Sequence, residues 1–262
     1  MALACVYYFL PKIIGRPIQS YNLSLVGFWS LAFFYGQVGG HHLIGGPVPG
    51  WLITLSIVQS VMMIVPVLAF SINQHLTMKG HFTRLWHSPT LRFIVLGGMM
   101  YTLSSIQGSI EALRSVNTVA HFTHFTVAHA HLGLYGFFTL VMFGAVYFVM
   151  PRVMDWEWPY PNLISLHFWL VVVGFGIYFV GLSIGGWLQG LAMLDAAKPF
   201  MDSVGVTIPW LKSRSVGGAI MALGHLVFAI HFVPMATRRG VAREGAALLN
   251  EPLKATTVPE AA

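Results

Sequence analysis

The chain has 262 residues, of which 56% are hydrophobic and only 8% are charged. Ordinary soluble domains carry about 25% charged residues, so the composition excludes a soluble globular protein and indicates a polytopic membrane protein. The formal net charge of +6 requires no nucleic-acid partner, because a topology signal in the loops explains most of it. Cys5 is the single cysteine and no C-x-x-C-H run occurs, which excludes an internal disulfide and a covalently attached c-type haem.

The apolar segments predict an all-α fold, a bundle of transmembrane helices. The first segment, Met1 to Leu10, is half the length of a span, and we interpret it as the tail of a truncated helix. Six full spans follow, since each has the roughly 20 apolar residues that cross a bilayer. They run over residues 21–44, 51–73, 91–113, 125–150, 163–194 and 216–235. We therefore expect a membrane domain over residues 1–240 and a polar, disordered tail over residues 241–262.

The basic residues of the loops predict the orientation of this bundle. Basic residues in short loops are retained on the cytoplasmic side of the membrane. One side collects Lys12, Arg16, Lys79, Arg84, Arg92, Arg152, Arg238, Arg239, Arg243 and Lys254. The other side has only Arg114, Lys198, Lys212 and Arg214. We expect the C-terminal tail to be cytoplasmic.

Two histidine pairs lie at the ends of predicted spans, where ionisable side chains are costly and usually functional. His41 and His42 end the first full span on the non-cytoplasmic side, and His129 and His131 begin the fourth on the same side. Successive helical residues are rotated by about 100°, so His129 and His131 face nearly opposite directions and can ligate two cofactors. His41 and His42 can converge on one ion, and neutral imidazole suits copper, iron or zinc.

Other histidines in the spans stand alone, and for these we favour a hydrogen-bonded imidazole packed between helices. They are His167, His225 and His231.

The residues around the two pairs match a known family. Phe34-Tyr35, Gly39-Gly40-His41-His42 and Val127-Ala128-His129-Ala130-His131 resemble the catalytic subunit I of haem-copper oxidases, in particular that of the cbb3-type cytochrome c oxidase. Further agreement comes from Tyr8-Phe9-Leu10-Pro11-Lys12, Ser115-Val116-Asn117, His121-Phe122-Thr123, Gly144-Ala145-Val146-Tyr147 and His167-Phe168-Trp169-Leu170.

The resemblance implies a role for each histidine of the pairs. His41 and His42 would ligate the copper called CuB, His129 the high-spin b3-type haem, and His131 the low-spin haem b. Tyr35 stands six residues before His41, the spacing of the family's redox-active tyrosine, and would be catalytic by supplying a proton and an electron for O–O cleavage.

Weaker assignments surround the centre. The resemblance implies that His121, with Asn117 in the same stretch, would bind the haem propionates. Arg114 would also pair with a propionate, although a snorkelling anchor at a helix end explains this residue equally well. Tyr21 and Ser24 lie 14 and 11 residues before Tyr35, on roughly the same helical face, and are candidates for a proton path from the cytoplasm.

Some positions depart from the family. Gln107 stands where a glutamate is usual, His124 where an aspartate is usual, and Gly27 where a histidine is usual. The third CuB histidine and the second axial histidine of the low-spin haem lie upstream in the family and are not in this sequence. We therefore expect the isolated chain to be inactive.

The function implied is that of part of a respiratory terminal oxidase in a bacterial inner membrane. It would take electrons from cytochrome c through c-type cytochrome subunits and reduce O2 to water, coupled to proton translocation. One alternative is a relative of the nitric oxide reductase large subunit, with non-haem iron in place of copper. Tyr35 argues against it, as does the presence of a single acidic residue, Glu111, in the six spans. Another alternative is a non-catalytic membrane remnant of the same fold, surrounded by lipid.

Overall fold

A computed structural model describes residues 1–239 and residue 242. Within that part every named element is a helix, and the only strand-like pairing is an isolated bridge between Trp156 and Ala242. The all-α prediction is confirmed. The predicted tail over residues 241–262 lies, apart from Ala242, outside the described residues.

Five helical segments are long and apolar enough to cross a membrane. They are Gly50–Met78, Pro89–Glu111, His124–Met154, Asn162–Leu194 and Phe200–Ala236. These segments correspond to the last five of the six predicted spans. The chain therefore has the helices of a multi-pass membrane protein.

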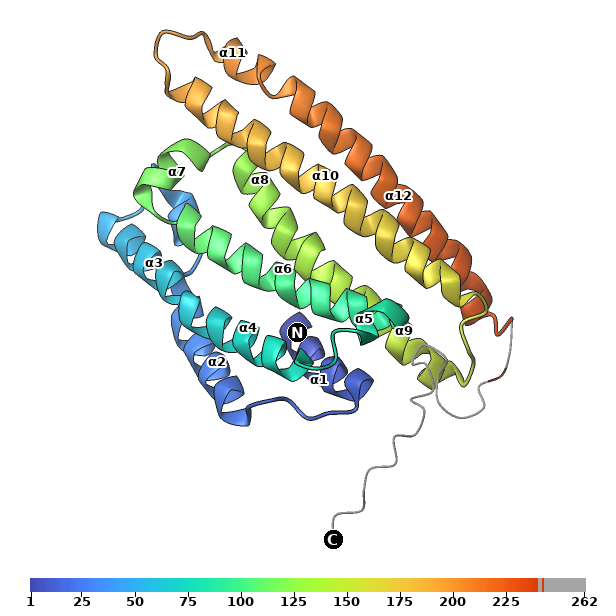
Figure 1. Ribbon diagram of the computed structural model, residues 1–262. Coiled ribbons are helices and arrows are strands. Elements are labelled where there is room, and N and C mark those ends of the chain that lie inside the picture. Colours follow the sequence, from blue (N-terminus) through green and yellow to red (C-terminus); the bar gives the residue numbers. More distant parts are fainter. Residues whose placement is uncertain (240–241, 243–262) are drawn as a thin grey trace.

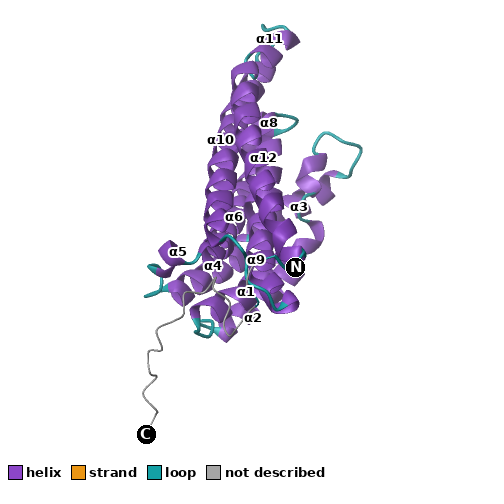
Figure 2. Ribbon diagram, turned by 90° about the vertical axis from the view of Figure 1, so that its right-hand side faces the viewer, coloured by secondary structure: helices purple, strands orange, loops and turns teal. Residues whose placement is uncertain are grey.

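The helices follow one another with short connections (Figure 1). In chain order they are α1 (Ala2–Ile14), α2 (Tyr21–Phe34), η1 (Tyr35–Gln37), η2 (Gly40–Leu43), α3 (Gly50–Met62), α4 (Ile64–Met78), α5 (Arg84–His87), α6 (Pro89–Glu111), α7 (Arg114–Ala120), α8 (His124–His131), η3 (Leu132–Thr139), α9 (Leu140–Met154), α10 (Pro161–Leu194), α11 (Phe200–Gly205) and α12 (Ile208–Ala236). The longest two, α10 and α12, lie side by side, and α6 and α8 stand beside α10 (Figure 2).

The prediction of a full helical span over residues 21–44 is wrong. Ser20 caps α2 by accepting a hydrogen bond from the backbone N–H of Leu23 at 3.1 Å, but α2 has only 14 residues. At 1.5 Å per residue it is about 21 Å long, less than the roughly 30 Å of a bilayer core. The chain continues in two short 3-10 turns, η1 and η2.

Gly39 and two side chains of α3 account for the early end of α2. Gly39 has a φ of +96°, which side-chain-bearing residues rarely adopt. The backbone of Gln37 is held from α3, with its N–H donating to Gln59 Oε1 at 3.0 Å and its carbonyl accepting from Ser56 Oγ at 2.6 Å. His41 and His42 consequently lie on a 3-10 turn and not at the end of an α-helix.

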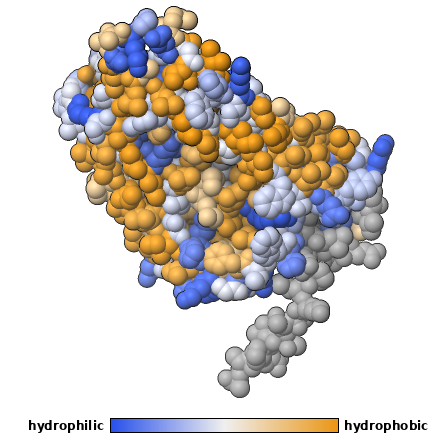
Figure 3. Space-filling view, turned by 45° about the horizontal axis from the view of Figure 1, so that its top comes forward, coloured by the Kyte–Doolittle hydropathy of each residue, from blue (hydrophilic) through white to orange (hydrophobic). Residues whose placement is uncertain are grey.

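On the face of the molecule that Figure 3 shows, the surface between the two polar ends is mostly apolar. Large apolar side chains are exposed along α2 and α12, among them Phe28, Phe33, Leu223 and Ile230. Such an apolar belt is typical of helices that face lipid or neighbouring membrane subunits.

The helix that carries the second histidine pair changes its winding directly after that pair. Thr123 caps α8 by accepting from the N–H of Phe125 at 3.2 Å. The following eight residues, η3, are π-helical before α9 resumes α-helical winding. π-Helical segments are rare and are frequent at functional sites.

Candidate functional site

A cavity of about 740 Å³ opens between α2, η1, η2, α6 and α8. Tyr35, His41, His42 and His129 all line it. Its volume falls within the roughly 300–1,000 Å³ of ligand and cofactor pockets. The fold thus brings together four residues that are up to 94 positions apart in the sequence (129 − 35).

His41 is held in one orientation at the edge of this cavity. Its side chain is 3% exposed, and Nδ1 lies 3.0 Å from Ser60 Oγ of α3. Nε2 is buried and has no hydrogen-bond partner in the described part of the chain. The ring centroids of His41 and His42 are 4.2 Å apart. A histidine with one nitrogen hydrogen-bonded and the other unpartnered is typical of a metal ligand.

His129 packs against the glycine face of α6. A Cβ placed at Gly108 would lie 2.8 Å from His129 Cε1, so no larger residue fits without moving the ring. Nδ1 of His129 is also buried without a hydrogen-bond partner among the described residues. His129 thus offers an imidazole beside a cavity of cofactor size, and this arrangement fits a haem iron held by histidine.

His131 lies on the other side of α8. Its Nδ1–H donates to the carbonyl of Val127 at 2.8 Å, and its ring centroid is 5.2 Å from that of Tyr178 on α10. A proton on Nδ1 leaves the lone pair of Nε2 available to a metal. The opposite placement of His129 and His131 agrees with the helical angle expected from the sequence.

The described residues contain no group of three or more His, Cys, Asp or Glu side chains that could hold a metal ion. His41 and His42 are therefore an incomplete ligand set by themselves. Tyr35 lines the same cavity and is 63% exposed.

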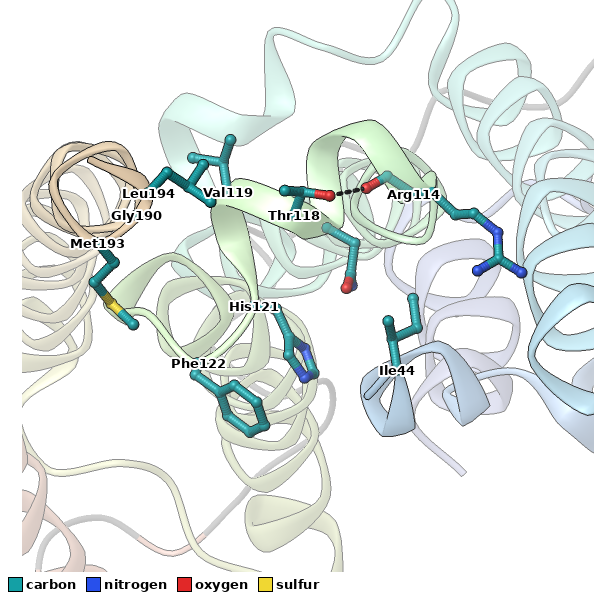
Figure 4. A pocket seen from close by; sticks show the side chains of 10 residues that line it. Ile44, Arg114, Thr118, Val119, His121, Phe122, Gly190, Met193 and Leu194 are labelled. Atoms are coloured by element: carbon teal, nitrogen blue, oxygen red, sulfur yellow. Dashed lines mark hydrogen bonds between the residues drawn. The ribbon is translucent and has the colours of Figure 1, made fainter. Parts of the chain in front are cut away.

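A second cavity, of about 440 Å³, is lined by Arg114, Asn117 and His121 (Figure 4). Asn117 is buried and donates from Nδ2 to the carbonyl of Glu111 at 3.3 Å, and Arg114 Nη2 donates to Thr54 Oγ1 at 3.2 Å. His121 Nε2 is buried without a partner in the described part of the molecule. In Figure 4 the side chains of Phe122 and Ile44 flank the His121 ring. The three residues predicted to bind the haem propionates, Arg114, Asn117 and His121, therefore line one cavity.

The two residues of the predicted proton path are not near Tyr35. Tyr21 is 69% exposed at the start of α2. Ser24 Oγ donates to the carbonyl of Ser20 at 3.1 Å and accepts from Asn73 Nδ2 at 2.9 Å. Neither lines the 740 Å³ cavity, and the path stays a prediction.

The three departures from the family differ in their surroundings. Gln107 precedes the glycine that packs on His129, and its Oε1 is buried without a hydrogen-bond partner in the described part of the chain. The N–H of His124 donates to Gln189 Oε1 at 3.0 Å, and a Cβ at Gly27 would contact Ala69 at 3.6 Å. Glu111, one helical turn after Gln107, is fully buried and accepts a hydrogen bond from Thr126 on α8. Its signal in the sequence is an acid in an apolar segment.

The family model described as cytochrome c and quinol oxidase polypeptide I matches residues 1–220. The chain belongs to this family. It is therefore a member of an oxidoreductase family of membrane proteins that binds haem and metal.

Similar bacterial proteins include cytochrome c oxidase subunit 1 of Rhodobacter capsulatus, 35% identical over 87% of this chain and 44% of that protein. The cbb3-type cytochrome c oxidase subunit CcoN1 of Stutzerimonas stutzeri is 36% identical over 87% of this chain and 49% of its own length. A nitric oxide reductase polypeptide of the same organism is 24% identical over 87% of this chain and 50% of its own length.

A solved structure has a similar fold. A heme-copper terminal oxidase dimer, determined by cryo-EM, matches 95% of this chain and 47% of its own chain with a TM-score of 0.72 and 18% identity. The chain spans less than half the length of the curated oxidase relatives cited above.

Proposed function

We propose that this chain forms part of the catalytic subunit of a cbb3-type cytochrome c oxidase, which reduces O2 to water with electrons from cytochrome c and translocates protons. The observation that carries the proposal is the gathering of Tyr35, His41, His42 and His129 around one cavity, with His131 on the opposite side of α8. The similarity to CcoN1 supports the cbb3 type.

The histidines would hold the cofactors. His129 would ligate the high-spin b3-type haem, His131 the low-spin haem b, and His41 with His42 the CuB ion. When bound, these groups supply the electron-transfer and O2 chemistry, whereas the protein supplies ligands, orientation and protons. The third copper ligand and the second axial ligand of haem b would come from outside this sequence, so the isolated chain would be inactive.

The surrounding residues orient these ligands and handle protons. Ser60 fixes the ring of His41, and the carbonyl of Val127 fixes the ring of His131. The phenol of Tyr35, at the cavity wall, would give its hydroxyl proton to the O2-reducing centre. Arg114, Asn117 and His121 would hydrogen-bond the haem carboxylates in the second cavity. Tyr21 and Ser24 would begin a proton path from the cytoplasm.

The proposal includes the chain's setting. It would lie in a bacterial inner membrane with its C terminus in the cytoplasm, and it would assemble with c-type cytochrome subunits that receive electrons from cytochrome c. Its membrane spans and its family support the membrane setting, and the proposed orientation rests on the basic residues of the loops.

The test is the loss of one haem at a time from the assembled complex. We expect His131→Ala to remove the low-spin haem signal from the reduced-minus-oxidised spectrum and His129→Ala to remove the high-spin signal. His41→Ala should lower the copper content while both haem signals persist. His81→Ala is the matched control, because His81 lies in a loop with its Nδ1 on the carbonyl of Lys79 at 3.2 Å.

Each outcome decides between the alternatives. A wild-type complex without b-type haem would contradict the oxidase proposal and favour the non-catalytic remnant. Iron without copper at the His41–His42 site would favour the nitric oxide reductase alternative.

A further inference from the structure

Two tyrosines outside the proposed centre are each paired with a histidine. The phenol oxygen of Tyr135 lies 2.9 Å from Nε2 of His225, and that of Tyr147 lies 2.9 Å from Nδ1 of His167. Tyr147 and His167 are fully buried. The pairs join η3 and α9 to α12 and α10, and none of these four residues has a part in the proposed function.

The Tyr135 pair is connected by stacked rings to His131. The ring centroid of His131 is 5.2 Å from that of Tyr178, Tyr178 is 6.4 Å from Phe175, and Phe175 is 5.3 Å from Tyr135. The last two contacts are parallel stacks, with interplanar angles of 18° and 28°.

The Tyr147 pair is connected to the Tyr135 pair and to the far end of the bundle. Phe143 bridges the pairs, with centroids 5.5 Å from His225 and 4.5 Å from His167. Beyond Tyr147, the ring of Trp158 follows at 4.9 Å, His231 at 4.7 Å from Trp158, and Tyr160 at 6.5 Å from His231. Tyr160 is 58% exposed.

These rings form a continuous row from His131 to Tyr160, and the row can carry electrons but not protons. Phe175 and Phe143 carry no titratable group, so a proton cannot pass through their rings. Electron transfer needs only closely spaced rings and oxidisable groups, and tyrosine and tryptophan are the oxidisable aromatic side chains. A phenol bonded to imidazole loses an electron more readily, because its proton has an acceptor at hand.

We propose that the row is an electron-transfer path that carries oxidising equivalents from the side of α8 that bears His131 to Tyr160 at the protein surface. A one-electron oxidant takes an electron from Tyr135, whose phenol proton moves to Nε2 of His225. Tyr147 then gives one electron to the Tyr135 radical and its proton to Nδ1 of His167, while His225 returns its proton to Tyr135.

The path ends at the surface. Tyr160 gives one electron to the Tyr147 radical and its phenol proton to water, and His167 returns its proton to Tyr147. A soluble one-electron reductant of the ascorbate or thiol class, with a proton from water, restores Tyr160. The inference rests on the proposed function only for the source of the oxidant, which would be the O2-reducing haem centre after it has reacted with O2 without its full supply of electrons. The path would protect the haem centre from oxidative damage by carrying oxidising equivalents away from it to the protein surface.

The experiment injects an oxidising equivalent at the Tyr160 end of the membrane-embedded complex. Asn162→Cys, exposed at the start of α10, is labelled with a ruthenium tris-bipyridine photo-oxidant in a Cys5→Ser background. After flash oxidation we expect a tyrosyl radical by electron paramagnetic resonance and, with the haem reduced beforehand, oxidation of the low-spin haem. Tyr147→Phe and Tyr135→Phe should each slow haem oxidation at least about tenfold.

The controls separate electron transfer from folding. Tyr→Phe variants keep their ring contacts, and an unchanged haem spectrum and thermal transition would show that they fold. Tyr8→Phe, exposed on α1 and outside the row, should have no effect. Unchanged haem oxidation rates in both row variants would overturn the path. A complex without haem that still shows a radical dependent on Tyr147 would contradict the proposed function and support the path.

Discussion

Ser60 fixes the ring of His41 through the 3.0 Å hydrogen bond to Nδ1. Removing such a partner from a metal-ligating histidine typically lowers metal affinity about 10- to 100-fold. We therefore expect Ser60→Ala to weaken copper binding by about that factor in the assembled complex. Copper content per haem, titrated against a competing chelator, measures the change.

Ser30→Ala is the matched control for this prediction. The Ser30 hydroxyl donates within α2, to the carbonyls of Val26 and Gly27, so its loss should leave copper affinity unchanged. Equal affinities for the Ser60 variant and the wild type would refute the assignment of His41 as an oriented copper ligand.

At the residue scale, the sequence predicts the residues that line the cavity better than the residues that orient them. Tyr35, His41, His42 and His129 meet at one cavity, because the motif and the common depth of the spans already place them together. Ser60 was missed, since its contact with His41 depends on how α3 packs against a 3-10 turn. The pairing of lone histidines with hydrogen-bond partners is confirmed for His167 and His225, but their tyrosine partners depend on tertiary packing.

Among the elements, α10 and α12 bring their backbones close together at two glycines, Gly174 and Gly217. A Cβ at Gly217 would lie 2.5 Å from the carbonyl oxygen of Gly174 and 2.7 Å from the nitrogen of Tyr178. Backbone atoms cannot yield as a flexible side chain can, so α12 would have to move. We expect Gly217→Ala to destabilise the protein by about 1–3 kcal/mol, the usual cost of overpacking. Thermal unfolding in detergent measures it.

The neighbouring Gly218 provides the control, because no atom of the described residues lies within 4 Å of a Cβ placed there. Both substitutions remove the same backbone freedom from the same helix, so only packing separates them. A Gly218→Ala variant as unstable as Gly217→Ala would show that the close approach of the two helices is not what matters.

At the element scale, hydropathy locates helices well and their ends less well. The segment predicted over residues 163–194 corresponds to α10, Pro161–Leu194. The segment predicted from residue 216 begins earlier, at Ile208, because Lys212 and Arg214 are polar but continue the helix. At α2 the predicted helix is too long. Hydropathy does not show that the backbone of Gln37 is hydrogen-bonded to side chains of α3.

In the whole molecule, the basic loops gather at one end. Arg16 Nη1 donates to the carbonyl of Lys79 at 3.1 Å, and Arg84 donates to that of Ile14, which ties two basic loops together. The ends of α7 and α11 lie at the opposite end of the bundle (Figure 1). If the basic end is cytoplasmic, cysteines at the two ends should differ in their access from outside the cell.

We expect a membrane-impermeant maleimide to label Ala197→Cys but not Thr83→Cys in intact spheroplasts, each in the Cys5→Ser background. Both positions are exposed, so access to reagent depends on the membrane side. Permeabilised cells are the control and should label both. Labelling of Thr83→Cys alone in intact spheroplasts would reverse the proposed orientation.

The π-helical segment η3 sets the rotational register of the long helix on either side of it. His131 and Tyr147 both meet α10, through Tyr178 and His167, although they are 16 residues apart (147 − 131). In an uninterrupted α-helix that spacing would place them about 160° apart, on nearly opposite sides. The wider winding of η3 corrects this offset. An insertion or deletion of one residue within residues 132–139 would therefore rotate Tyr147 by about 100° away from the face it shares with His131.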